Sequence, residues 1–239
     1  MLALPLASQS DHDKEITISL SNPNEPGYLS INHHKGSIHV TGCPGTSVIV
    51  KASTRFGTGG EPIHLGAVES NNHVVINATP RHRTIDLDIE VPHRFSLRLK
   101  NDDSGNITVE DLSGDLEISN INGDISLKDI SGYAVLDTVD GDMIVQFKEV
   151  APGLPMAFSS VEGNIDITFP KDINVLAKVK ADSGYIVNDF NGETEAKKQQ
   201  APKRNGPGKT SYYTINDGGP EVLLRSFLGN IYIRQQQDN

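Results

Sequence analysis

The chain has 239 residues, a net charge of −10, one cysteine and no tryptophan. The single cysteine, Cys43, excludes an intramolecular disulfide, and no apolar run approaches the about 20 residues of a transmembrane helix. Charge is uneven, since residues 101–190 hold 17 acidic and five basic residues while the remainder has a balance of +2. This acidic middle argues against nucleic acid as a partner, because phosphate binding requires clustered Lys and Arg.

The chain begins with a segment, residues 1–15, that we expect to be a flexible N-terminus, followed by a single domain over residues 16–235. Gly27 and Gly36 lie nine residues apart, and apolar residues stand two and four positions after each. Cys43 falls seven positions after Gly36. We expect it to be a small buried thiol rather than a nucleophile, because no motif supplies a basic partner to lower its pKa.

Alternating apolar and polar residues predict a set of strands before the middle of the chain. These strands cover Val48–Ala52, Val74–Ala78, Ile85–Val91 and Phe95–Leu99. Pro92 should end the third of them, because proline cannot donate to a central ladder. The Gly-rich loop Thr54–Pro62 contains neither GxxxxGK[ST] nor GxGxxG, so it predicts no phosphate site.

The middle of the chain, Ser104–Phe147, is an internal repeat of nine residues. Its glycines are Gly105, Gly114, Gly123, Gly132 and Gly141. Positions +2 and +4 after each glycine are apolar, which is the two-residue period of a strand with one buried face. Position +7 is also apolar in four units, as Leu112, Ile121, Ile130 and Val139, so we expect it to be buried too.

The repeat predicts an all-β fold, namely an elongated β-solenoid or β-roll of short strands. A nine-residue unit is too short for a strand and a crossover helix, and it fits a half-coil, with two units closing one turn. An antiparallel meander or sandwich is the alternative, because regularly spaced strands also suit those folds. The pattern resumes at Gly163, Gly184 and Gly229, around a flexible insertion expected at residues 191–211.

Two groups of side chains could hold a metal. The histidines are His12, His33, His34, His39, His64, His73, His82 and His93. They form no HExxH or HxxxH motif, so we expect surface or structural roles. The corner residues Asp115, Asp124, Asp142, Asn106, Asn164 and Asn230 resemble the turns of calcium-binding β-rolls, but the GGxGxD pattern is missing, and we interpret them as turn formers.

A polysaccharide lyase or hydrolase would need paired carboxylates, or a carboxylate beside Arg or Lys, in a cleft. The outward residues Glu110, Glu117, Lys128 and Asp137 could line one face, but they are mixed in type. Val135 and Ile144 are outward and apolar, and we expect the Pro152–Phe158 loop to cover them; an exposed contact patch is the alternative. The sequence therefore predicts no catalytic, cofactor-binding or metal-binding residue and no enzyme activity.

The run IDLDIEVPHRFSLRLKN, followed by SGNITVEDLSGDLEISNINGDISLKDISG, resembles a bacterial "putative adhesin" domain family of unknown function. The similarity covers roughly residues 25–235, and GSIHVTGCPGTSVIVKAS and LGNIYIRQ match the same style. The resemblance implies a β-solenoid at the cell envelope or surface and carries over no catalytic residues. The absence of a clear signal peptide keeps a cytoplasmic location open.

Together these observations favour a non-catalytic, adhesin-like binding or structural module that uses an extended surface. The expected partner is a protein or a polysaccharide, with no nucleic acid and no integral membrane segment. A solenoid carbohydrate-active enzyme and a self-polymerising scaffold are the alternatives, the second because unpaired edges on terminal rungs invite self-association.

Overall fold

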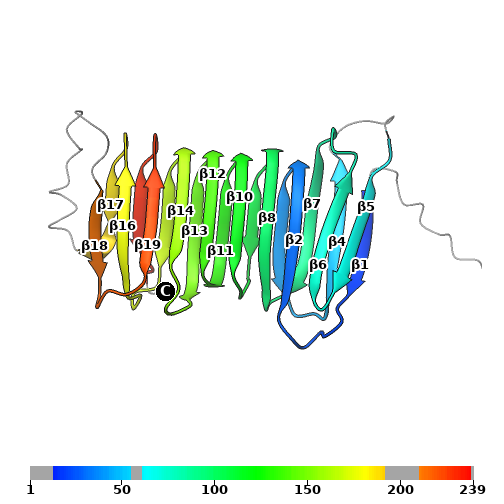
Figure 1. The fold of residues 1–239 in the computed structure, drawn as a ribbon, viewed down its shortest axis with the longest axis horizontal. Helices are drawn as coiled ribbons and strands as arrows, with labels where there is room; N and C mark the ends of the chain where they lie inside the picture. Colours follow the sequence, from blue (N-terminus) through cyan, green and yellow to red (C-terminus); the bar gives the residue numbers. More distant parts are fainter. Residues whose placement is uncertain (1–12, 55–60, 192–209, 238–239) are drawn as a thin grey trace, which may run out of the picture.

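The computed structural model describes residues 13–54, 61–191 and 210–237 (Figure 1). These residues form twenty β-strands and a single 3-10 turn, η1 (Asp189–Asn191), and no α-helix occurs among them. The strands build two ten-stranded sheets, called sheet A and sheet B here. The all-β prediction is confirmed.

Sheet A contains, in spatial order, β1 (Asp13–Ser19), β4 (Ser47–Thr54), β7 (Ile85–Pro92), β3 (Ile38–Cys43), β9 (Ile107–Glu110), β11 (Ile125–Gly132), β13 (Met143–Val150), β15 (Ile165–Phe169), β20 (Ile231–Gln235) and β17 (Ile186–Asn188). Sheet B contains, in spatial order, β18 (Ser211–Ile215), β16 (Val175–Ala181), β19 (Glu221–Ser226), β14 (Met156–Glu162), β12 (Ala134–Asp140), β10 (Leu116–Asn122), β8 (Phe95–Ser104), β2 (Gly27–Lys35), β6 (His73–Thr79) and β5 (His64–Ser70).

Successive repeat units alternate between the two sheets. In sheet A, β11 pairs in parallel with β13, and Ile125 lies opposite Met143, 18 positions later. In sheet B, β10 pairs in parallel with β12 in the same way. Two nine-residue units therefore close one turn, and the solenoid prediction holds rather than the antiparallel meander. One strand of sheet B and the next strand of sheet A form what we call a rung.

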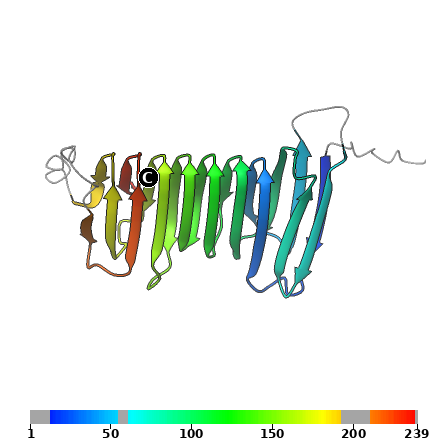
Figure 2. The same cartoon turned by 45° about the horizontal axis from the view of Figure 1, so that its top comes forward.

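The first and the last rung along the sequence are inserted between other rungs, so neither lies at an end of the stack. The rung β19–β20 lies between β14–β15 and β16–β17, and β2–β3 lies between β6–β7 and β8–β9. Figure 1 shows red β19 beside yellow β16 and blue β2 beside β8, and Figure 2 shows the same order from above. Similarity between first and last rungs is visible in the sequence, but this insertion is not.

Antiparallel strands finish both ends of the stack. Strands β1 and β4 continue sheet A beyond β7, and β5 continues sheet B beyond β6. At the other end β18 pairs antiparallel with β16. Strand β1 begins at Asp13, inside the segment predicted to be flexible, and β18 begins at Ser211, the last residue of the predicted insertion; residues 1–12 and 192–209 lie outside the described ones.

The core fills the space between the sheets with the +2 and +4 side chains of every rung. Phenylalanines add to it towards the C-terminal half: the ring of Phe147 stacks on Phe169 at 5.5 Å between centroids and meets Phe158 edge-on at 6.4 Å. Such stacked apolar columns are what lets each rung be stabilised by its neighbours alone.

The expectation that position +7 is buried is wrong in sheet B. Ile121 and Val139 are 43% and 48% exposed, because the two-residue period continues inward at +6 and turns +7 outward. In sheet A the prediction holds for Leu112 and Ile130, which are buried. Asp129, which precedes Ile130, has a positive φ of 56°, and the pairing register between β11 and β13 shifts at this point. The shift turns the side chain of Ile130 inward.

Position +6 of sheet B is therefore buried, and it carries polar residues. In register across neighbouring strands they are His33, Asn101, Asn120, Thr138, Ser160 and Ser226. We call this row the polar ladder. The Asn120 amide donates to the carbonyls of Gly105 and Gly123 at 2.9 and 2.8 Å, so the ladder ties the interior to the glycine corners.

Candidate functional site

Most rungs turn from sheet B into sheet A at a corner built around a repeat glycine, whereas the rung β6–β7 turns through residues 80–84, which contain none. We call the line of these corners the corner edge. Asx side chains form a ladder along it. The backbone N–H of Asp124 donates to Asn106 Oδ1 at 3.0 Å, that of Asp142 to Asp124 Oδ1 at 2.9 Å, and that of Asn164 to Asp142 Oδ1 at 2.7 Å. These predicted turn formers act as such.

The ladder continues to the C-terminal rungs. The N–H of Asn230 donates to Asn164 Oδ1 at 2.9 Å, and that of Tyr185 donates to Asn230 Oδ1 at 2.9 Å. Asp115 lies at the opposite corner, where its own N–H donates to Ser96 Oγ at 3.0 Å. Among the described residues, no group of three or more His, Cys, Asp or Glu side chains is placed to hold a metal ion.

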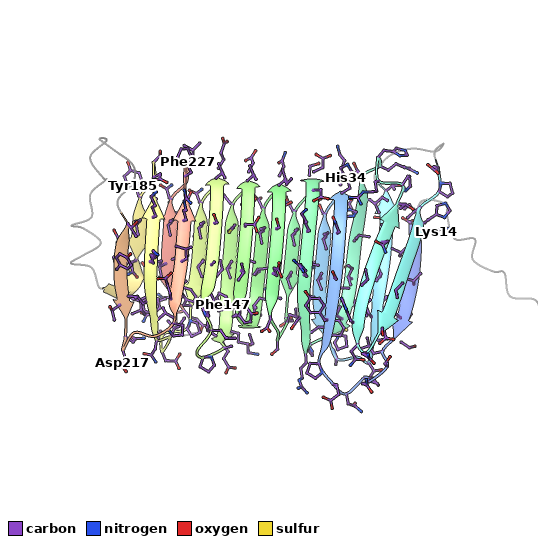
Figure 3. The ribbon with its side chains drawn as sticks, in the orientation of Figure 1. Lys14, His34, Phe147, Tyr185, Asp217 and Phe227 are labelled. Carbon is purple, nitrogen blue, oxygen red and sulfur yellow. The ribbon has the colours of Figure 1, made fainter. Side chains whose placement is uncertain are left out.

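Exposed apolar side chains line up beside the corner ladder. Ile121, Val139, Val161, Phe227 and Leu228 are 43–51% exposed, and we call them the apolar ridge. They fall in register because the preceding ladder residues Asn120, Thr138, Ser160 and Ser226 lie opposite one another on adjacent strands. In Figure 3, Phe227 and Tyr185 lie along the upper edge of the stack, with His34 further along it.

Acidic residues border the apolar ridge. Asp140 and Glu162 lie opposite each other one position beyond Val139 and Val161. On the neighbouring rung Asp102 takes the position of Ile121, and it bonds Lys100 at 2.9 Å and Arg81 at 3.3 Å. The ridge is thus an apolar strip with an acidic margin. In the sequence its one signal is that a strand with buried residues at +2 and +4 must turn the residue at +7 outward.

The described histidines lie at separate places on the two sheets and in the turns between their strands. His33 is buried in the polar ladder and donates from Nε2 to the Ile85 carbonyl at 2.7 Å; burial lowers the pKa of its imidazole. His93 donates from Nδ1 to the Asp111 carbonyl at 3.0 Å. His64 and His82 are exposed and His34 is partly buried, while His12 lies outside the described residues.

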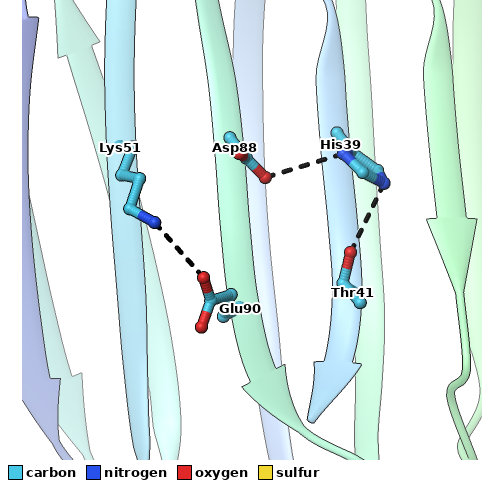
Figure 4. Close-up of polar contacts among 5 residues, drawn as sticks. All are labelled: His39, Thr41, Lys51, Asp88 and Glu90. Carbon is cyan, nitrogen blue, oxygen red and sulfur yellow. Dashed lines mark hydrogen bonds and ion pairs between the residues drawn. The ribbon is translucent and has the colours of Figure 1, made fainter.

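One histidine has neighbours that suggest a catalytic triad (Figure 4). His39 Nδ1 lies 3.6 Å from Asp88 Oδ1, and His39 Nε2 lies 3.3 Å from Thr41 Oγ1. Both side chains of the ion pair are largely exposed, at 45% and 60%, on the flat outer face of sheet A beside the Lys51–Glu90 pair. An acyl-transfer triad depends on short contacts away from water, and this arrangement has neither.

The outward residues Glu110, Glu117, Lys128 and Asp137 do not share a face, so that expectation is wrong. Lys128 lies opposite Glu110 on sheet A. On sheet B, Glu117 pairs with Arg98 at 3.1 Å and Asp137 accepts from Ser119 Oγ at 2.8 Å. Alternate repeat units belong to different sheets, which separates the two pairs.

The predicted cover over Val135 and Ile144 is also wrong, since they are 38% and 49% exposed on sheets B and A respectively. Because they lie on opposite faces, one loop could not cover both. Cys43 is half-buried rather than fully buried. Burial, with a smaller contribution from Glu90, raises the pKa of its thiol, which favours the unreactive protonated form.

Several depressions mark the surface of the described residues. One, about 670 Å³, lies between the loops after β13, β15 and β18 and includes Glu149 and Asp172. A second, about 500 Å³, includes Arg234, whose guanidinium bonds Asp166 at 2.7 and 2.8 Å; this pairing raises the pKa of Arg234. The third, about 280 Å³, lies on sheet B between Tyr28 and Tyr133.

No helix in the described part of the chain is long and apolar enough to span a bilayer. A search of curated proteins finds no match. Among solved structures, a "putative cell adhesion protein" from Clostridium sporogenes is similar at 13% identity, with 94% of this chain and all of that chain covered and a TM-score of 0.46.

Two further structures, each described as a "putative adhesin", come from Bacteroides fragilis and Parabacteroides merdae. They are 12% and 10% identical, cover 94% and 95% of this chain and 98% and 97% of their own, and have TM-scores of 0.37 and 0.34. The family model described as Toastrack DUF4097 matches residues 95–219, from β8 to the turn before β19. The resemblance noted in the sequence is confirmed, and the chain belongs to the Toastrack DUF4097 family.

Proposed function

We propose that this protein is a non-catalytic, adhesin-like binding module that contacts a protein partner along the apolar ridge. The observation that carries the proposal is the alignment of four exposed apolar side chains, Ile121, Val139, Val161 and Phe227, along the neighbouring strands β10, β12, β14 and β19, with exposed Leu228 next to Phe227. With strands about 4.8 Å apart, these four rungs present an apolar strip about 15 Å long.

The surroundings of the ridge support this assignment. Single exposed apolar residues are common, but a contiguous row of them marks an interaction site. Interfaces place apolar side chains at the centre and polar ones at the rim, and Asp140 and Glu162 supply such a rim here. Because this rim is acidic, the partner should carry Lys or Arg beside its own apolar contact.

A pair of charge substitutions tests the proposal. The double variant Val139→Glu, Val161→Glu should no longer recover a protein that the wild type recovers from bacterial envelope extracts. Ile144→Glu is the matched control, because Ile144 is equally exposed at 49% but lies on sheet A. Circular dichroism checks folding. Equal recovery by all three proteins, or none by the wild type, would contradict the proposal.

The same protein should not turn over a panel of neutral and uronic-acid polysaccharides. Reproducible release of reducing ends would instead support the carbohydrate-active enzyme. Loss of that release in a Glu149→Gln, Asp172→Asn variant would locate the activity in the depression that these two residues line.

A self-polymerising scaffold has one observation in its favour. The outermost strand of sheet B, β5, carries Val68 at 65% exposure, and its outer edge has no described partner strand. Exposed edges promote pairing between copies. Light scattering over a range of concentrations distinguishes the cases: a constant monomer mass excludes the scaffold, and a rising mass that Val68→Lys abolishes supports it.

A further inference from the structure

The depression between Tyr28 and Tyr133 is built from four adjacent strands on the outer face of sheet B. It is lined by Tyr28 on one side, Tyr133 on the other, and Ser96, Asp115 and Glu117 between them. The strands β2, β8, β10 and β12 follow one another in the sheet and span about 14 Å. The depression lies near the start of these strands, whereas the apolar ridge lies at their ends.

The polar side chains between the rings are already ordered. Asp115 N–H donates to Ser96 Oγ at 3.0 Å, which fixes the corner beside Tyr133. Arg98 Nη2 lies 3.1 Å from Glu117 Oε1, so the guanidinium and the carboxylate hold each other over the sheet. No described residue bonds the carboxylate of Asp115, which remains available as an acceptor.

One aromatic wall is also fixed by packing. The ring of Tyr28 meets His73 edge-on, with centroids 4.9 Å apart and planes at 77°. Partial burial, together with Glu117 and Tyr133, raises the pKa of Tyr28 against the opposing effect of Arg98. Its hydroxyl therefore remains a neutral group that can both donate and accept.

The mixture of groups identifies the ligand class. Arg98 does not line the depression, but its guanidinium pairs with Glu117 at 3.1 Å and offsets one of the two carboxylates, which weakens the attraction of an organic cation. An acidic ligand would meet the carboxylates of Asp115 and Glu117 in the lining. A neutral polyhydroxyl compound uses the polar and aromatic lining: carboxylates accept from its hydroxyls, the Ser96 and tyrosine hydroxyls donate to it, and ring surfaces cover its C–H groups.

We propose that this depression is a binding site for a neutral oligosaccharide, held between Tyr28 and Tyr133. Because the two tyrosines stand at opposite sides of four strands, the ligand needs more than one sugar ring to contact both. The site is separate from the apolar ridge, and it adds a glycan contact to a surface whose other edge contacts protein. A failed test here leaves the ridge proposal standing.

Isothermal titration with cellohexaose, maltohexaose and chitohexaose tests the site. We expect saturable binding of at least one of them, and no comparable binding of hexagalacturonate or choline. Tyr133→Ala and Asp115→Asn should each weaken that binding about tenfold or more. Tyr212→Ala is the matched control, because Tyr212 is 60% exposed on β18 of the same sheet but outside the depression, and it should bind like the wild type.

Three outcomes would overturn the proposal: no binding of any neutral hexasaccharide, equal or tighter binding of hexagalacturonate or choline, or unchanged affinity in either Tyr133→Ala or Asp115→Asn. Circular dichroism of each variant confirms that any loss of binding is not a loss of fold. Two variants are used because a change in either wall or floor alone should be enough to weaken the complex.

Discussion

Gly141 shows why a glycine recurs along the corner edge. Its φ is 145°, which disfavours residues with a side chain, and a Cβ would lie 2.2 Å from the Gly123 carbonyl oxygen of the neighbouring rung. Both the backbone conformation and the spacing between rungs thus require glycine. This geometry explains why glycine recurs at nine-residue intervals in the sequence.

Replacing Gly141 with alanine should destabilise the protein by at least about 2 kcal/mol, because backbone strain adds to a clash with an immobile carbonyl. Gly153→Ala is the control: φ is 84° there, but nothing lies within 4 Å of a built Cβ. Urea unfolding of both variants measures the difference. If the two variants lose equal stability, contact between rungs is not the reason for the glycine column.

The polar ladder makes a second residue-scale prediction. Thr138 Oγ1 is buried without a partner, so Thr138→Val should change stability by no more than about 1 kcal/mol. Asn120→Leu removes the donor from the Gly105 and Gly123 carbonyls and should cost about 1–3 kcal/mol. Thermal unfolding compares them, and a larger loss in Thr138→Val would contradict the described bonding of the ladder.

His33 should make the N-terminal rungs sensitive to mild acid. Because burial lowers its folded-state pKa below the ordinary 6.5, the unfolded chain takes up the proton first. Stability is therefore complete above about pH 6.5 and falls as the pH drops towards the folded-state pKa. Nearby Asp86 opposes the lowering of the His33 pKa, and His34 adds to it.

Urea midpoints at pH 7.5 and 5.5 measure this effect, with His33→Asn as the comparison, since asparagine occupies the next position of the ladder. The wild type should lose more stability than His33→Asn over this interval. Glu69, whose pKa is lowered by N–H groups of Ser21 and Asn72, titrates below the interval and does not confuse it. Parallel losses in both proteins would rule out His33 as the cause.

Among whole elements, the inserted rung β19–β20 joins the C-terminal part of the stack to the centre. Strand β19 lies between β14 and β16, and β20 between β15 and β17, so strands that come after β16 and β17 in the sequence complete the interior of both sheets. During folding, β14–β15 and β16–β17 must therefore either stay apart until β19–β20 inserts or separate again to admit it.

Truncation after Gly219 should therefore release β16, β17 and β18 while β8 to β13 keep their pairing. Hydrogen exchange should show loss of protection in the released strands only. Truncation after Gln236 is the control, because it leaves β20 and its bond from Gln236 N–H to the Phe169 carbonyl intact. Retained protection of β16 in the shorter chain would show that it can pair directly with β14.

The positions of most strands can be predicted from the sequence, but which strands pair with one another cannot. Alternation located β4, β6, β7, β8 and the central repeat, since period-two patterning reflects one buried face. Strands β5 and β18 were missed, because antiparallel edge strands carry only a weak apolar pattern. No local pattern records that β2–β3 and β19–β20 insert between other rungs, as this depends on long-range pairing.

The site was less predictable than the fold. The turn role of Asp124 and Asp142 follows from residue type, but the apolar ridge was hidden by reading position +7 as buried. Tyr28 and Tyr133 lie 105 positions apart in the sequence, and only the coil brings them to one depression. In a repeat fold, short-range sequence patterns therefore predict the strands, but they do not predict the surfaces that form when the rungs stack.

At the scale of the whole molecule, the protein is a rod with two sheet faces and an exposed apolar ridge along one edge. Its charge is concentrated on the central rungs, where residues 101–190 have a balance of −12. Association with a basic partner should therefore be fastest at low ionic strength and slow as salt screens the acidic margin. Stopped-flow or biosensor association rates at several salt concentrations check this, and salt-independent rates would contradict a role for the acidic margin.

The central claim is that the partner lies on the corner edge, and hydrogen exchange of the complex tests it most directly. With the partner recovered from envelope extracts bound, peptides containing Ile121, Val139, Val161 and Phe227 should gain protection. Peptides from the centre of β13, which contain the outward-facing Ile144, should not gain protection. Protection confined to the sheet faces, with the corner edge unchanged, would contradict the account.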